Sequence, residues 1–212
     1  MKAYKPENKS IVSGQVLKCP YDFKKARLVV REMADALALD LVDKGLVTNQ
    51  LVLTVGYDRE NLDDPYRRQN YQGPVTTDRY GRKIPKHAVG TENFPYTSSA
   101  NDLLKAVTAL YDRIVDKNLL VRRLSISANK LLPEADVPSK NEAEQLDLFT
   151  DYAAKEQREL ADEATYARER KLQEAMLGIK KRYGKNAILK GMNLEDGATA
   201  RERNQTIGGH HE

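Results

Sequence analysis

The chain has 212 residues, a formal net charge of +4 and a single cysteine. This length suits one domain with appendages or two small domains. No stretch reaches the roughly 18 apolar residues that span a bilayer, and the first ten residues lack a signal-peptide core, so we expect a cytoplasmic protein. Cys19 cannot form an internal disulfide and has no metal-ligand spacing with the three histidines, so no bound metal is expected.

The charge is unevenly distributed along the chain. Residues 1–130 carry +7, residues 131–170 carry −6 and residues 171–212 carry +3. A basic first part suits a polyanionic partner, and an acidic neighbour would stay away from the same polyanion. An ordinary mixed surface explains the same numbers, so charge alone does not identify a partner.

The first 45 residues predict a strand followed by an amphipathic helix. Residues 10–17 read as the strand, Asp22 has the residue type of a helix N-cap, and Gly45 has that of a C-cap. Between the caps, apolar residues recur at spacings of three and four, which indicates one buried helical face. These residues are Ala26, Val30, Met33, Leu37 and Leu41.

The pattern then repeats with a longer connection. Residues 51–57 alternate as a strand, residues 61–83 read as a long loop or protruding hairpin, and a third strand is expected around 86–94. A second amphipathic helix precedes a fourth strand at 120–131. Together they predict an α+β fold, with a four-stranded sheet in β-α-β-β-α-β order and two helices on one face. The buried positions of the second helix would be Leu103, Val107, Leu110 and Ile114.

The fourth strand indicates which side of the sheet is left uncovered. Leu124, Ile126 and Ala128 alternate with polar residues and would face the helices. The other face would then carry a cation and short hydroxyl donors. These groups suit phosphate oxygens better than base edges, because they include no side-chain set that makes the paired hydrogen bonds by which a base is recognised. The polar positions are Arg123, Ser125, Ser127 and Asn129.

Residues elsewhere would extend this phosphate-binding surface. A second group surrounds Gly14, where glycine lets a backbone amide approach a phosphate closely. For each residue alone a solvated surface is the more common explanation, but two groups on one sheet weaken it. The expected set is Lys9, Ser10, Ser13, Gly14, Lys83, Lys86, Arg122, Arg123, Ser125 and Ser127.

Residues 132–150 read as a linker that carries the pentapeptide Gln145-Leu146-Asp147-Leu148-Phe149. Its large apolar side chains have no obvious core to join, and exposed apolar clusters usually mark an interaction surface. Gln145 can both donate and accept hydrogen bonds. The alternative is a short apolar turn that packs back on its own domain.

Residues 151–183 predict a long charged helix that ends at Gly184, and its polar first half is typical of a solvated spacer. Residues 184–212 form a basic tail. The only docking stripe expected on the helix is Leu172, Ala175, Met176 and Ile179.

Three segments resemble the C-terminal part of a Y-family (DinB/UmuC, ImpB/MucB/SamB-like) translesion DNA polymerase. They are residues 9–17, residues 121–126 and the pentapeptide at 145–149. With the order of the helices, the resemblance covers about residues 5–150 and points to the "little finger" domain, which grips template-primer duplex through backbone contacts. The tail at 184–191 and 208–210 also looks like that of a subset of these polymerases.

The resemblance implies a part of a DNA-repair and damage-bypass (SOS) polymerase, with primer-template DNA and the β sliding clamp as partners. Residues 1–131 would be the DNA-binding domain, and the pentapeptide is similar to the QLxLF peptide that docks on the clamp. Gln145 would enter a polar pocket of the clamp. The apolar clamp-binding residues would be Leu146, Leu148 and Phe149.

The catalytic palm of this family uses carboxylates to hold two metal ions, expected to be Mg²⁺, for phosphoryl transfer. That palm would precede Met1, so we expect the present chain to be a non-catalytic piece without a cofactor of its own. Its acidic pairs, Asp63-Asp64 and Asp162-Glu163, read as loop and solvated-helix residues.

Two other interpretations stay open. The chain could be a free-standing adaptor that binds DNA or a protein, or a ferredoxin-like interaction module whose sheet face dimerises. An enzyme has little support, because the sequence contains no P-loop, Rossmann glycine pattern, nucleophile elbow or zinc cluster.

Overall fold

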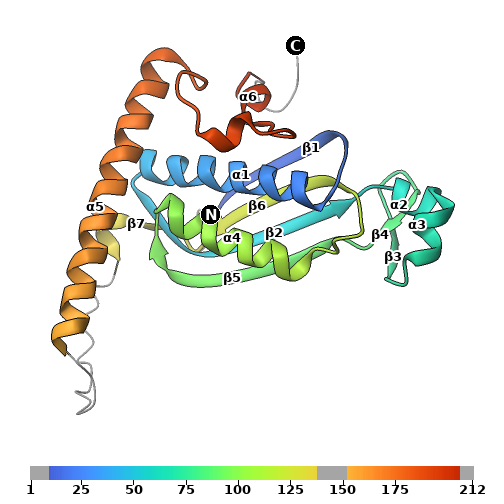
Figure 1. Ribbon diagram of the computed structural model, residues 1–212, viewed down its shortest axis with the longest axis horizontal. Helices are drawn as coiled ribbons and strands as arrows, with labels where there is room; N and C mark the ends of the chain where they lie inside the picture. Colours follow the sequence, from blue (N-terminus) through green and yellow to red (C-terminus); the bar gives the residue numbers. More distant parts are fainter. Residues whose placement is uncertain (1–9, 138–151, 206–212) are drawn as a thin grey trace, which may run out of the picture.

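The computed structural model describes residues 10–137 and 152–205 and shows a mixed α/β body with a long C-terminal helix (Figure 1). A lobe projects from one end of the sheet, and the long helix runs past the other end. No helix in the described ranges is long and apolar enough to cross a membrane. In chain order the elements are β1 Ile11–Tyr21, α1 Phe23–Asp43, β2 Leu46–Tyr57, α2 Glu60–Asp63, α3 Pro65–Asn70, β3 Val75–Thr77, β4 Lys83–Pro85, β5 Ala88–Thr97, α4 Ala100–Ile114, β6 Val121–Asn129, β7 Leu132–Pro133, η1 Glu134–Asp136, α5 Tyr152–Tyr183, η2 Gly191–Leu194 and α6 Ala200–Arg203.

The main sheet is antiparallel and runs in the order β1-β6-β2-β5. α1 connects β1 to β2, which flank β6, and α4 connects β5 to β6, which flank β2. Each helix therefore joins two strands that are separated by one antiparallel strand. β7 pairs with the beginning of β2 as a fifth strand. The expected four-stranded sheet in β-α-β-β-α-β order is thus not confirmed as stated, because β7, α2 and α3 were missed.

The first covering helix begins at the N-cap that the sequence predicted, and the second begins at a similar cap. The Asp22 carboxylate accepts a hydrogen bond from the Lys25 amide at 2.8 Å, and the Ser99 hydroxyl accepts one from the Asp102 amide at 3.2 Å. Each cap satisfies an amide that has no partner within its helix. After α1 the chain turns at Gly45, whose φ of 62° favours glycine.

The hydrophobic core lies between the two helices and the sheet. All five apolar positions predicted for the first helix are buried. In β6, Leu124, Ile126 and Ala128 are fully buried, so the predicted alternation of this strand is confirmed. Burial of apolar surface at about 25 cal/mol per Å² holds the helices on this face. Within residues 10–137 and 152–205, no helix covers the other face of the sheet.

Residues 58–87 form the projecting lobe, which we call the arm (Figure 1). The hairpin expected in this region is present as β3 and β4, but α2 and α3 were missed. α3 starts with Asp64 as N-cap and Pro65 at its first position, a signal that the sequence does contain. Asn61 is fully buried, and its side chain bonds the carbonyls of Asp58 and Leu120 and the amide of Leu120. These bonds fasten the arm to the sheet end.

α5 docks on the body through its second half. Met176 and Gln173 are buried, whereas Leu172 is 58% exposed and Ile179 is 37% exposed. The docking stripe predicted from the sequence is therefore correct only at Met176. Polar contacts, such as the bond from the Gln173 amide to the Ser98 carbonyl at 3.1 Å, replace the expected apolar ones.

The tail after α5 folds back over α1 (Figure 1). Glu32 of α1 is 1% exposed, and its carboxylate accepts hydrogen bonds from the Thr199 and Ala200 amides at 2.8 and 3.1 Å. Lys190 of the tail forms an ion pair with Asp35. The basic tail thus meets buried acids of α1, a pairing that no sequence pattern indicated.

Candidate nucleic-acid interface

The side of the sheet away from α1 and α4 is here called the open face. Directly opposed residues of an antiparallel ladder share one face of the sheet, so the pairing of the strands defines its rows. Val12, Val16 and Val89 are 62%, 59% and 61% exposed, which shows that the described residues leave this face uncovered. The three rows are Val12, Ser127, Val52 and Thr91; Gly14, Ser125, Thr54 and Val89; and Val16, Arg123 and Gly56.

Arg123, Ser125 and Gly14 lie together on the open face, although the sequence placed Gly14 in a separate group from Arg123 and Ser125. Gly14 is directly opposite Ser125 on the neighbouring strand, and Arg123 follows in the next row. Arg123 is exposed, and none of the carboxylates in the described part of the chain pairs with it. The site therefore offers an unpaired guanidinium beside a hydroxyl and a glycine backbone, a combination suited to phosphate oxygens.

Two other predicted residues have partners within the chain. The Ser127 hydroxyl donates to Asn129 Oδ1 at 2.7 Å, so its proton is not directed to a ligand. Arg122 donates to the Lys18 carbonyl at 3.1 Å and lies 3.7 Å from Asp58. Arg122 therefore braces the base of the arm and contributes less charge to the open face than Arg123.

Ser13 does not share the open face with Gly14. It is opposite Ile126, whose side chain is fully buried beneath the helices, so Ser13 lies on the covered side. The sequence placed Ser13 and Gly14 in one group, but neighbouring residues of a strand point to opposite faces. Ser10 is exposed just before β1, and Lys9 is outside the described residues.

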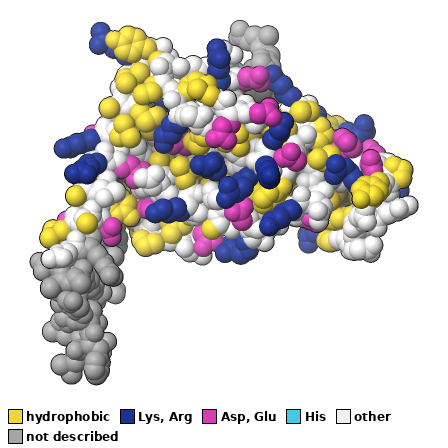
Figure 2. All heavy atoms as spheres, viewed as in Figure 1, with side chains coloured by type: hydrophobic (Ala, Val, Ile, Leu, Met, Phe, Trp, Pro, Cys, Tyr) yellow, Lys and Arg dark blue, Asp and Glu magenta, His cyan; other side chains and the backbone are white. Residues whose placement is uncertain are grey.

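The valines of the open face were missed as site residues. Val12 and Val16 alternate with Ser13 and Gln15 in the sequence, so the signal was available, but a branched apolar residue in a strand is normally assigned to the core. Their exposure makes the face a mixture of apolar side chains with polar and charged groups. Figure 2 shows the opposite side of the body, which α1 and α4 cover, with Lys and Arg interspersed with Asp and Glu.

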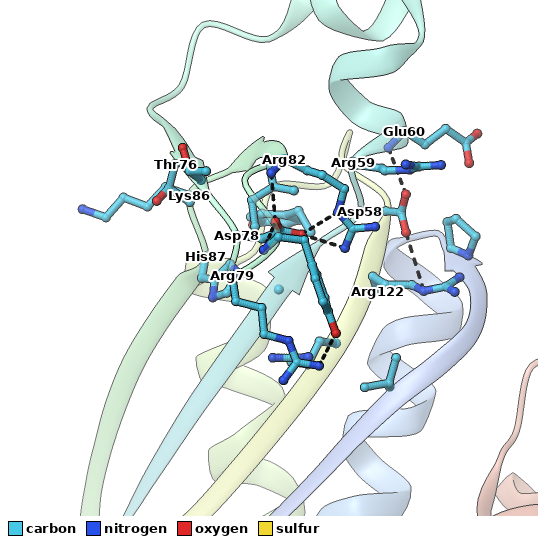
Figure 3. Close-up of a pocket in the computed structure, with 18 of the residues that line it drawn as sticks. Asp58, Arg59, Glu60, Thr76, Asp78, Arg79, Arg82, Lys86, His87 and Arg122 are labelled. Carbon is cyan, nitrogen blue, oxygen red and sulfur yellow. Dashed lines mark hydrogen bonds and ion pairs between the residues drawn. The ribbon is translucent and has the colours of Figure 1, made fainter.

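A cavity of about 1010 Å³, here called the arm cavity, lies where the open face meets the arm (Figure 3). Val16, Gly56 and Arg123 line it from the sheet, and Arg79 and Tyr80 line it from the hairpin. Lys86 is also exposed at this cavity, whereas Lys83 is exposed on β4 and does not line it. The hairpin therefore overhangs one end of the open face.

Several charges of the arm cavity neutralise one another. Asp78 pairs with Arg82 at 2.7 Å, and Asp63 with Arg59 at 3.6 Å. The hydrogen bond from Arg82 holds the pKa of the Asp78 carboxyl below its ordinary value, and Asp78 in turn raises the pKa of Arg82. Arg79 has no carboxylate partner among the described residues and donates to the Tyr80 hydroxyl at 2.6 Å. The sequence did not single out Arg79, although its Asp-Arg-Tyr-Gly-Arg context marks a basic turn.

The pentapeptide Gln145 to Phe149 lies outside the described residues, and so do His210 and His211. Over residues 10–137 and 152–205, no three His, Cys, Asp or Glu residues are grouped in a way that could hold a metal ion.

A family comparison covers well over half of the chain. The description "impB/mucB/samB family C-terminal domain" matches residues 8–148. The chain belongs to the impB/mucB/samB family. The resemblance seen in the sequence is thereby confirmed, and the matched range takes in the sheet, both covering helices and the arm. α5 and the tail lie beyond it.

Comparison with other known proteins adds little. A solved structure titled "Complex of beta-clamp processivity factor and little finger domain of PolIV" is similar over 67% of this chain and 100% of that chain, with 9% sequence identity and a TM-score of 0.37. A likeness this low supports no inference about the present chain. None of the curated proteins matches it.

Proposed function

We propose that this chain is the non-catalytic, DNA-binding and clamp-docking part of an error-prone translesion DNA polymerase. Family membership supports the polymerase context. The observation that carries the DNA-binding proposal is Arg123, which has no carboxylate partner among the described residues and lies beside Ser125 and Gly14 on the open face. Such a surface binds the sugar-phosphate backbone without reading bases, so binding would tolerate any sequence.

The DNA-binding proposal is tested by the variant Arg123→Ala. Each phosphate that a protein neutralises releases counterions, so the salt dependence of binding reports the number of phosphate contacts. We expect Arg123→Ala to weaken binding equally on duplexes of different sequence. The slope of log K against log salt should become shallower by about 0.9. Fluorescence anisotropy across a salt series measures both.

The matched control is Lys105→Ala, which removes the same charge from the exposed surface of α4 on the covered side. This variant should bind duplex with the affinity and slope of the unmodified chain. If Arg123→Ala leaves the slope unchanged, Arg123 does not contact phosphate.

The clamp-docking proposal rests on the pentapeptide. The double variant Leu148→Ala with Phe149→Ala should abolish binding to the β sliding clamp, because large apolar side chains provide most of the energy of a docked peptide. Duplex affinity should stay the same. A pull-down with purified clamp provides the measurement, and Glu142→Ala with Glu144→Ala serves as the control in the same linker. Retained clamp binding by the apolar double variant would refute the proposal.

A second function is favoured by one observation, the exposure of Val12, Val16 and Val89 on the open face. Apolar groups on an uncovered sheet suit self-association through that face. Sedimentation of the chain without DNA separates the two functions. A stable dimer that dissociates when duplex is added would mean that the two partners share the face.

A further inference from the structure

The arm cavity differs from the open face in shape and therefore in what it can hold. A duplex can lie along an uncovered sheet, but at one end the β3–β4 hairpin overhangs the strands and encloses a space of about 1010 Å³. Pockets of roughly this volume hold small molecules and single groups. A single strand needs less room beneath the hairpin than a duplex does.

The charge inside the arm cavity favours an anion. Six cationic and four acidic side chains line it. Three of the acids already pair with cations, namely Asp58 with Arg122, Asp63 with Arg59 and Asp78 with Arg82. Among the described residues, the cations left without a carboxylate are Arg79, Arg123 and Lys86. Figure 3 shows Arg79 extending from the hairpin over the strands, while Lys86 points away from it.

Tyr80 gives the arm cavity an aromatic wall. Its side chain is 65% exposed and therefore accessible to a ligand. The guanidinium carbons of Arg79 and Arg82 lie 4.7 and 4.9 Å from its centroid, a cation–π geometry that orients both groups. A charged groove combined with an exposed aromatic ring is the usual composition of sites for single-stranded nucleic acid.

The arm is also held in a fixed position. Besides the three bonds of buried Asn61, Arg67 donates to the Asn118 carbonyl at 3.3 Å, and the Asp58 amide donates to the Leu120 carbonyl at 2.9 Å. A pre-positioned wall lowers the entropy cost of binding.

We propose that the arm cavity binds the unpaired nucleotides of a strand that continues beyond a duplex on the open face. Arg79 and Arg123 would contact the phosphates, and Tyr80 would stack against a base. This inference rests on the proposed function for its duplex part only. It assigns to the arm the recognition of the junction between paired and unpaired DNA.

The test compares three DNA ligands by fluorescence anisotropy: a blunt duplex, the same duplex with a short single-stranded extension, and oligothymidylate. The unmodified chain should bind the extended duplex about tenfold more tightly than the blunt one, since one stacked base and its phosphate contribute about this much. Arg79→Gln and Tyr80→Ala should each remove most of this preference and leave the blunt-duplex affinity unchanged.

The control is Arg68→Gln, which makes the same charge change on the exposed side of α3, away from the arm cavity. It should retain the preference. Absence of a preference in the unmodified chain, or an equal loss on both duplexes in Arg79→Gln, would overturn the proposal. The proposal would also be overturned if inorganic phosphate abolished the preference for the extended duplex while chloride at equal ionic strength did not. The site would then be one for free phosphate.

The two proposals fail in different ways. If blunt duplex does not bind, but oligothymidylate binds and depends on Arg79, the open-face proposal is refuted and the arm cavity remains a single-strand site. If blunt duplex binds through Arg123 and the extension adds nothing, the arm inference alone is refuted.

Discussion

Tyr111 of α4 connects the two covering helices, because its side chain contacts Phe23 at the start of α1. Its ring is fully buried, lies 4.9 Å from the ring of Phe23, and its hydroxyl donates to the Phe23 carbonyl at 3.0 Å. Burial raises the pKa of Tyr111 well above its ordinary value of 10.0. The folded state therefore keeps this proton at pH values where the unfolded chain releases it.

The variant Tyr111→Phe separates the hydrogen bond from the titration. Near pH 7 we expect it to be about 1 kcal/mol less stable, because one buried hydrogen bond is lost. As the pH rises above 10, the unmodified chain loses stability through Tyr111, by up to about 1.4 kcal/mol per pH unit. The difference in free energy of unfolding between the unmodified chain and Tyr111→Phe should therefore become smaller. Urea denaturation at pH 7, 10 and 11 measures the difference, and the other tyrosines cancel because both chains contain them.

A constant difference between the two chains over this pH range would show that the Tyr111 hydroxyl titrates normally. A neutral substitution at pH 7 would show that its hydrogen bond contributes nothing to the free energy of unfolding.

At the scale of elements, the contact between β5 and α4 depends on one glycine. A Cβ at Gly90 would lie 2.8 Å from Leu110 Cδ1 and 2.9 Å from Ile114 Cγ2, well inside the usual carbon–carbon distance. Gly14 provides a contrast on the open face, where the nearest atom to an added Cβ is the Leu124 carbonyl oxygen at 3.9 Å. Packing therefore requires glycine at residue 90 but not at residue 14.

We expect Gly90→Ala to lower the free energy of unfolding by about 1–3 kcal/mol, since the packed Leu110 and Ile114 side chains of α4 have to shift. Gly14→Ala should change it by less than about 0.5 kcal/mol. The same urea titrations measure both. Similar losses would mean that packing against α4 is not what selects glycine at residue 90. Weaker duplex binding by a stably folded Gly14→Ala would support a phosphate contact at that backbone.

At the scale of the whole molecule, the parts beyond the matched family range complete the covered side. The carboxylate of Glu32 receives bonds from Thr199, Ala200 and Asn193, and Lys190 pairs with Asp35. The Glu169 carboxylate also caps the start of α4 through the Asn101 amide at 2.9 Å. α5 and the tail thus bind the helices, while the open face stays available for a ligand.

A chain that ends at Tyr183 tests how far the tail supports the body. Removal of residues 184–212 takes away the partners of Glu32, so we expect a loss of about 2 kcal/mol or more in the free energy of unfolding. Glu32→Ala should cost a similar amount in the complete chain and almost nothing in the shortened one, because the carboxylate then faces water. Such a double-mutant cycle isolates the coupling. Equal costs of Glu32→Ala in both chains would contradict the contact, and Glu195→Ala is the control within the tail.

The residue order alone indicated the four long strands of the sheet, the two covering helices with the caps of the first, and the family. Each of these follows from local periodicity, capping chemistry or a short ordered motif, as with Asp22 before α1 and the alternation of Leu124 to Ala128 in β6. The interpretation of residues 61–83 as a long loop or protruding hairpin also came from local sequence.

Only the tertiary structure decided which polar groups meet. Ser13 and Gly14 are neighbours in the chain but lie on opposite faces, while Arg123 and Arg79 come together in the arm cavity from separate elements. The Glu32 carboxylate accepts a hydrogen bond from the Thr199 amide, which lies 167 residues further along the chain. A buried carboxylate needs hydrogen-bond donors, and the fold can supply them from residues far away in the sequence. No local sequence pattern indicates which residues these are.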